Sequence, residues 1–147
     1  MTFTLADAVN IARKAHEGQV DKAGQPYVDH PLRVMASLEG AGLAEQMAAV
    51  LHDVVEDTTV TLAELEQMGC PSLVLNAVSA LTHWPDEPQA TYYAKVASNP
   101  VALVVKRADI ADNLSPDRAS LLDPTTRERL REKYETALRL LEYYENG

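Results

Sequence analysis

Apolar residues recur at three- and four-residue spacing along most of the chain, which is the spacing of helices that each bury one face. Short polar segments containing glycine or proline separate the apolar stretches. The pattern predicts helices over about 4–16, 31–40, 44–55, 61–69, 71–81 and 89–97, one that begins at 100 and a last one that follows 123–124. We therefore expect an all-α fold, with about seven or eight helices in one bundle-like domain over residues 1–147.

The ends of these helices carry signals of their own. Thr4 with Asp7, and Thr61 with Glu64, have the spacing of N-terminal caps that bond the first helical turn. Prolines stand at the predicted first position of three helices, namely Pro31, Pro71 and Pro100. The apolar run 101–105 could by itself be a strand, but the proline before it and the helical spacing of polar residues after it favour a helix.

The charge balance excludes one broad class of function. Asp and Glu number 22 against 13 Lys and Arg, a formal net charge of −9. General nucleic-acid binding relies on a basic surface, so we expect no nucleic-acid partner. An anionic substrate would need a local basic patch and a metal ion to overcome the unfavourable field of the whole molecule.

Other features of the composition bear on location. No stretch of about 18 apolar residues is present, so no membrane span is expected. The first residues lack the basic and then apolar pattern of a signal peptide. The single cysteine, Cys70, cannot form an internal disulfide and suits a reducing compartment. These features predict a cytoplasmic protein.

The segment Leu51–Thr58 places one histidine and three carboxylates within six positions beside a strongly apolar stretch. On a continuous helix His52 would lie against Glu56, and Asp53 against Glu56 and Asp57, because residues three and four apart share a face. Charges beside a core helix are costly unless they are paired or bind a metal. The segment therefore predicts a site.

Two further polar islands extend this site. One surrounds His30, and the other is 106–109 with Asn113 one turn later. Together with the His-Asp pair they give a mixed nitrogen and oxygen set: His30, His52, Asp53 and Asp109. Such a set suits one Mn²⁺ ion, with Fe²⁺, Zn²⁺ and Mg²⁺ as rivals, and would leave coordination positions for water and a phosphate oxygen. Glu56 and Asp57 could then orient the attacking water or carry its proton.

At these residues the chain resembles the HD-type metal phosphohydrolases, and among them the hydrolase domain of the Rel/Spo alarmone enzymes and the small alarmone hydrolases. The matching segments are 15–19, 24–31, 51–58 and 106–109, and the resemblance runs from about 11 to 113. It implies a hydrolase without a synthetase domain that removes the 3′-pyrophosphate of (p)ppGpp with Mn²⁺ and leaves GDP or GTP. The implied partner is thus a small nucleotide, while the oligomeric state, monomer or homodimer, stays open.

The resemblance also implies roles for individual residues. The implied metal ligands are His30, His52, Asp53 and Asp109, and the implied catalytic pair is Glu56 and Asp57. Asn113 matches a further site residue, and Lys22 and Lys106 are the candidate phosphate contacts. By contrast His16 is expected to be structural, His83 to lie at the surface, and the tail helix to be a salt-bridged surface helix.

The chain departs from the family pattern on the substrate side. Asp21 stands where the family usually has arginine, and 110–115 reads Ile-Ala-Asp-Asn-Leu-Ser instead of Arg-Leu-His-Asn-Met-Arg. The substrate could therefore be another nucleotide, such as an adenosine alarmone, a nucleoside phosphate or a dinucleotide-phosphate cofactor. A non-catalytic nucleotide sensor is the alternative of a different class, and the retained Glu56–Asp57 pair argues against it.

Overall fold

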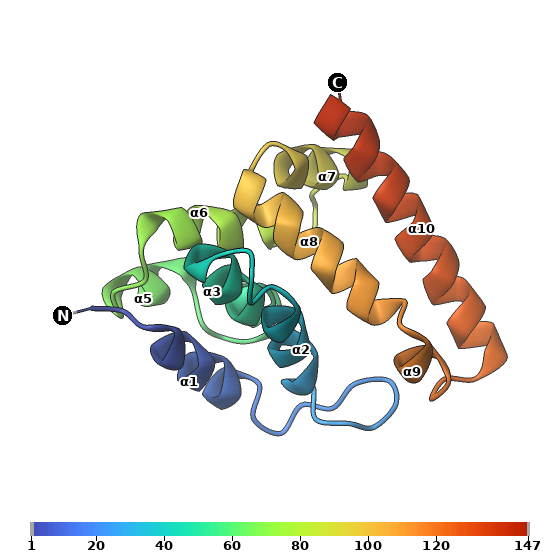
Figure 1. The fold of residues 1–147 in the computed structure, drawn as a ribbon, viewed down its shortest axis with the longest axis horizontal. Coiled ribbons are helices and arrows are strands. Elements are labelled where there is room, and N and C mark those ends of the chain that lie inside the picture. The colour runs from blue at the N-terminus through green and yellow to red at the C-terminus, as the bar shows by residue number, and fades with distance from the viewer. Residues whose placement is uncertain (1, 147) are drawn as a thin grey trace.

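The computed structural model describes residues 2–146, and the regular elements in that part of the chain are helices (Figure 1). They are α1 (Leu5–Ala15), α2 (Asp29–Ser37), α3 (Leu43–Leu51), α4 (Val54–Asp57), α5 (Leu62–Gln67), α6 (Ser72–Leu81), α7 (Gln89–Ala97), α8 (Pro100–Asn113), α9 (Pro116–Ala119) and α10 (Pro124–Asn146). The all-α prediction is confirmed, and the two helices beyond the predicted eight are the single turns α4 and α9. Within the same residues, no helix is both long and apolar enough to cross a membrane.

The predicted helix starts are confirmed where a side chain caps the first turn. Thr4 and Thr61 each accept from the backbone N–H three residues on, and Asp7 and Glu64 bond back to the cap, which completes two capping boxes. At α8 the side chain of Asn99 is the cap and Pro100 follows it. The run 101–105 is therefore helical, as predicted.

One predicted start was wrong by two residues, because α2 begins at Asp29 rather than at Pro31. A proline is tolerated anywhere in the first helical turn, since the backbone N–H groups there have no partner within the helix. His30 therefore lies inside the first turn of α2, and its side chain is buried.

The prediction of one continuous helix over 44–55 was also wrong. The chain leaves the helix after Leu51 and resumes it at Val54, and Asp53 has φ −102° and ψ −2°, away from helical values. The imidazole Nδ1 of His52 lies 2.5 Å from the carbonyl oxygen of Ala49, so the side chain caps the end of α3. His52 thus faces Asp53 and Asp109 instead of stacking on Glu56.

Helix α3 lies at the centre of the packing. All residues from Met47 to Leu51 are buried, and α3 contacts α1, α2, α6 and α8. Ala8 and Ala12 are the residues of α1 that are fully buried. Because their side chains are small, α1 and α3 can approach closely. A helix that is apolar on every side can hold the adjoining His52 and Asp53 firmly in the interior.

The C-terminal helices close the fold on the other side. α10 returns past α8 toward α7 and packs against both (Figure 1). Ala137 and Leu141, one turn apart, are its fully buried residues. The first turns of α10 therefore lie beside the end of α8 that carries Asp109 and Asn113.

Candidate functional site

Three side chains from separate elements meet in the interior as a candidate metal site: His30 of α2, His52 at the end of α3, and Asp109 of α8. Their residues are only 4%, 2% and 5% exposed. The Oδ1 atom of Asp109 lies 2.6 Å from His30 Nε2 and 3.3 Å from His52 Nε2. Two imidazoles and a carboxylate are a donor set that binds divalent metals, so these residues fit such an ion.

The far nitrogen of each imidazole fixes the orientation of its ring. His52 Nδ1 faces the carbonyl oxygen of Ala49, and His30 Nδ1 lies 2.6 Å from Asp112 Oδ2. When Nδ1 donates to these acceptors in a neutral ring, Nε2 keeps a lone pair that can bind a metal ion. Burial lowers the pKa of His30, but the hydrogen bonds to Asp109 and Asp112 outweigh it and raise the pKa overall.

Asp53 joins this group from the break between α3 and α4. Its Oδ2 atom lies 3.1 Å from His52 Nε2 and accepts from the hydroxyl of Tyr27 at 2.6 Å. Burial alone would raise the pKa of Asp53, but His52 and the hydroxyl of Tyr27 lower it to about 2. Asp53 therefore contacts the cluster of His30, His52 and Asp109 through His52.

Glu56 and Asp57 lie beside Asp53 on α4, and these three offer carboxylate oxygens within 4.8 Å of one another. Glu56 Oε1 accepts from the backbone N–H of His83 at 2.7 Å, and Asp57 Oδ2 accepts from Tyr27 at 3.2 Å. Desolvation raises the pKa of both Glu56 and Asp57, and the nearby carboxylates add to it, although the hydrogen bonds from His83 and Tyr27 oppose the shift. Both residues are exposed on the solvent side of the buried cluster, where a carboxylate can reach a bound substrate.

A cleft of about 890 Å³ opens above these residues. Eight of the nine predicted site residues line it: Lys22, His30, Asp53, Glu56, Asp57, Lys106, Asp109 and Asn113. The ninth, His52, is buried in the cluster beneath it. A cleft of this volume has room for a small molecule such as a nucleotide.

Two of the predicted site residues, Asn113 and Lys106, contact Asp109. The amide of Asn113 donates to the backbone carbonyl of Asp109 at 3.1 Å and lies 3.3 Å from its Oδ1. Lys106 Nζ lies 3.3 Å from Oδ2 of the same carboxylate and 5.3 Å from the centre of the Tyr92 ring. Lys106 and the histidines hold the pKa of Asp109 well below its usual value, against the effect of burial.

The structure adds residues that sequence reasoning missed. Asp112 bonds His30 and also pairs with Arg33 at 3.0 Å and Arg118 at 2.9 Å, and Arg118 reaches on to Asp21 at 3.4 Å. Although burial opposes the shift, these hydrogen bonds hold the pKa of Asp112 far below its usual range. The spacing of Asp112, three residues after Asp109, was a usable signal, whereas Arg118 and Asp21 are too far apart in sequence for a pattern to connect them.

Two histidines, His16 and His83, lie outside the predicted set of site residues. His16 is buried, and its Nδ1 lies 3.0 Å from Gln19, whose amide donates to the backbone of Asp57. His83 is half-buried rather than at the surface, because its ring stacks on Tyr92 at 4.4 Å. Both therefore support the walls of the cleft.

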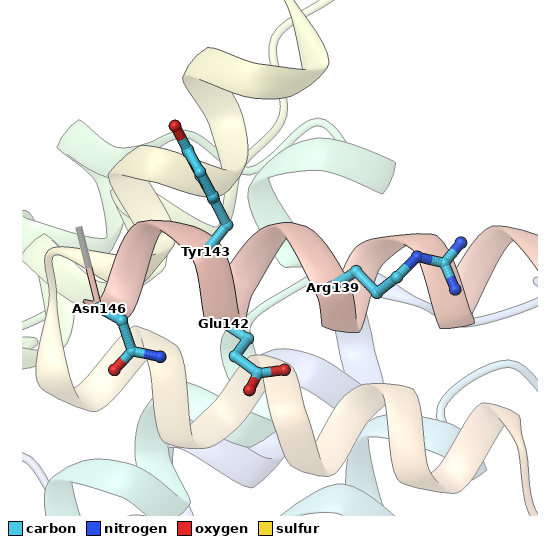
Figure 2. Close-up of a pocket in the computed structure, with 4 residues that line it drawn as sticks. All are labelled: Arg139, Glu142, Tyr143 and Asn146. Carbon is cyan, nitrogen blue, oxygen red and sulfur yellow. The ribbon is translucent and has the colours of Figure 1, made fainter.

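A second hollow, of about 430 Å³, lies along the last turns of α10 (Figure 2). Its lining residues all come from that one helix: Arg139, Glu142, Tyr143 and Asn146. In the described part of the chain, none of them belongs to a cluster of potential metal ligands. The larger cleft is thus the candidate site.

Comparison with known families agrees with this geometry. The model of the HD domain matches residues 8–84, which include His30 and the His52–Asp53 pair. The matched part begins within α1 and ends after α6, whereas Asp109 and helices α7 to α10 lie beyond it.

Several curated proteins are similar to the chain. The bifunctional (p)ppGpp synthase/hydrolase SpoT of Escherichia coli strain K12 is 35% identical over 122 residues, which cover 75% of this chain and 17% of that protein. A GTP pyrophosphokinase of Streptomyces coelicolor is 35% identical over 117 residues, covering 73% of this chain and 14% of that protein. A guanosine-3′,5′-bis(diphosphate) 3′-pyrophosphohydrolase of Haemophilus influenzae is 46% identical over 59 residues, covering 39% and 9%. The chain therefore spans less than a fifth of the length of these relatives.

A solved structure shares the fold over nearly the whole chain. It is described as a metazoan ortholog of SpoT that hydrolyses ppGpp, and it superposes with a TM-score of 0.78 at 23% sequence identity. The superposition covers 96% of this chain and 88% of that one. At this identity the likeness shows the fold, which here includes the C-terminal helices.

Proposed function

This chain belongs to the HD-domain family, and from that premise we propose that it hydrolyses the 3′-pyrophosphate of (p)ppGpp, releasing GDP or GTP and pyrophosphate. The observation that carries the proposal is the meeting of the buried cluster of His30, His52 and Asp109 with Glu56 and Asp57 at the floor of one cleft. The names of the relatives, which include ppGpp hydrolases, support the choice of substrate.

In this proposal His30, His52, Asp53 and Asp109 hold one divalent ion, for which Mn²⁺ is the first choice. When bound, the ion supplies Lewis-acid chemistry by lowering the pKa of water and withdrawing charge from phosphate. The buried position of these residues excludes bulk solvent, which strengthens the electrostatic interactions among them.

Glu56 acts as the general base in the reaction. Its carboxylate is oriented by the N–H of His83, and its raised pKa makes it a better proton acceptor than an ordinary glutamate. The water it activates attacks the phosphorus that is bonded to the ribose 3′ oxygen. The bond between that phosphorus and the 3′ oxygen then breaks, the 3′ oxygen takes a proton, and pyrophosphate leaves.

The remaining site residues position the reactants. Asp57, held by Tyr27, helps to orient the water, and Asn113 holds Asp109 in place. Lys22 and Lys106 bind phosphate oxygens, because both line the cleft and carry a positive charge.

The decisive experiment incubates metal-stripped protein with ppGpp and Mn²⁺ and resolves the products by ion-exchange chromatography. We expect GDP and pyrophosphate, and no reaction when a chelator is present. Glu56→Ala should keep the metal and lower turnover at least about a hundredfold, as loss of a general base does, whereas Asp53→Ala should lose the metal as well. Wild-type turnover by Glu56→Ala would refute the assignment of the base.

A different nucleotide is the second candidate, and one observation favours it. Arg118, a cation of the cleft, is bound to Asp21 and Asp112, two of the positions that depart from the family pattern. The guanidinium is thereby less available to an anionic substrate. A turnover panel of ppGpp, adenosine alarmones, nucleoside phosphates and dinucleotide phosphates separates the candidates, and metal retention without turnover of any of them would indicate a sensor.

A further inference from the structure

The cations that line the cleft differ in whether a carboxylate already neutralises them. Arg33 and Arg118 pair with Asp112, and Lys106 pairs with Asp109. Among residues 2–146, no carboxylate lies within 4.0 Å of the ammonium group of Lys22 or of Lys133, and both line the cleft. In a chain with 22 acidic and 13 basic residues, two unneutralised lysines in one cleft point to an anionic ligand.

Lys133 is directed toward the cleft by the geometry of α10. It precedes Ala137 by four residues and Leu141 by eight, so all three share one face of the helix. Ala137 and Leu141 are fully buried against the rest of the molecule, whereas Lys133 is exposed because the cleft opens at this turn. A lysine on the inward face of a helix that also remains open to solvent is placed to meet a ligand.

Three lysines from distant parts of the chain converge here: Lys22 from the loop before α2, Lys106 from α8 and Lys133 from α10. Desolvation, followed by the charges of Lys106 and Lys22, lowers the pKa of Lys133. Like charges held together are unfavourable unless an anion lies between them. A pyrophosphate group, with several negative oxygens, matches this arrangement.

We propose that Lys133 is a phosphate-binding residue which, with Lys22 and Lys106, holds the pyrophosphate group of the substrate above the buried cluster. The inference rests on the proposed function, since it names the part of the substrate that α10 binds. It also assigns a role to a helix that lies outside the matched HD-domain segment 8–84. The prediction that this tail is only a salt-bridged surface helix was therefore incomplete, because its first turns line the cleft.

The test titrates inorganic pyrophosphate by calorimetry into protein loaded with one equivalent of Mn²⁺, and measures metal content afterwards. Lys133→Gln should weaken pyrophosphate binding about tenfold, since it removes one charge-assisted hydrogen bond, while metal content stays unchanged. Lys133→Arg should restore most of the affinity because it keeps the charge. Arg129→Gln is the matched control, for it removes one exposed positive charge of the same helix outside the cleft, and its affinity should stay within about twofold of wild type.

Two outcomes separate this inference from the proposed function. Equal pyrophosphate affinity of Lys133→Gln and Arg129→Gln would overturn the role of Lys133, even if ppGpp is hydrolysed. A tenfold loss in Lys133→Gln without hydrolysis of ppGpp would support the phosphate site and overturn the choice of substrate. With an active enzyme, Lys133→Gln should also raise KM for the nucleotide, and its unfolding midpoint should match that of Arg129→Gln.

Discussion

At the scale of single residues, the candidate site depends on side chains that orient the potential metal ligands. Asp112 fixes the ring of His30, and the hydroxyl of Tyr27 bridges Asp53 and Asp57. Such outer partners set which nitrogen or oxygen is presented to a metal, and losing one typically weakens metal binding or activity by about 10- to 100-fold. The ability of the cluster to bind a metal therefore depends on Asp112 and Tyr27 as well as on the ligands themselves.

Asp112→Ala should lower the affinity for Mn²⁺ by about 10- to 100-fold, because His30 loses the acceptor that fixes its ring. Asp112→Asn, which keeps an acceptor oxygen, should fall between Ala and wild type. Competition with a fluorescent chelator measures the affinities. Asp86→Asn, at an exposed position that does not line the cleft, is the control. If Asp86→Asn lowered the affinity for Mn²⁺ as much as Asp112→Ala, the role of Asp112 would be contradicted.

The affinity for Mn²⁺ should fall as the pH decreases from about 8 to about 6, beginning above the usual histidine pKa of about 6.5. Burial opposes protonation of both His30 and His52, but the neighbouring carboxylates outweigh it and raise both pKa values. A raised pKa means that protons occupy the rings at a higher pH and compete with the metal there. Dissociation constants measured across this range should show the decline, and a flat profile would argue against these histidines as ligands.

At the scale of the elements, the break between α3 and α4 and the packing of α10 shape the cleft. The break turns Asp53 toward His52, and α4 then presents Glu56 and Asp57 to the cleft. α10 supplies the opposite wall, held by Ala137 and Leu141. In both places a buried residue fixes the chain and an exposed residue nearby faces the cleft: His52 and Glu56 at the break, and Ala137 and Lys133 on α10.

Leu141→Ala should destabilise the protein by about 2–5 kcal/mol, the usual cost of a cavity left by a buried leucine. Leu138→Ala, on the same helix at a position 37% exposed, is the matched control and should cost less than about 1 kcal/mol. Urea unfolding of the two variants gives the comparison. Equal losses would mean that Leu141 does not anchor α10.

At the scale of the whole molecule, a net charge of −9 surrounds a cleft whose floor is also acidic. Four carboxylates, those of Asp53, Glu56, Asp57 and Asp109, lie in one region and repel one another. A divalent cation would relieve this repulsion and bind only the folded chain, since the cluster joins residues from distant parts of the sequence.

Mn²⁺ should therefore stabilise the protein, by about 2.7 kcal/mol at a free concentration one hundred times its Kd. Thermal unfolding with increasing Mn²⁺ measures the shift in Tm. Asp109→Asn removes a carboxylate shared by both histidines, so its Tm should not respond to the metal. A metal-dependent rise in that variant would place the ion elsewhere.

The sequence by itself determined the all-α fold, most helix ends and the residue types of the cluster. These depend on local interactions, such as the caps at Thr4 and Thr61, and on apolar spacing that any chain with this pattern must bury. Eight of the nine residues expected at the site line the cleft, although their roles in binding and catalysis stay predictions.

Only the tertiary structure decided how those residues meet. His30 reaches Asp109 and Asp112 across 79 and 82 positions, and Lys133 enters the cleft because two later residues of its helix are buried. The break after Leu51 likewise depends on where the ring of His52 is placed. These contacts depend on how distant helices pack together. The spacing of residues along a chain predicts only which residues lie side by side within a few turns of one helix.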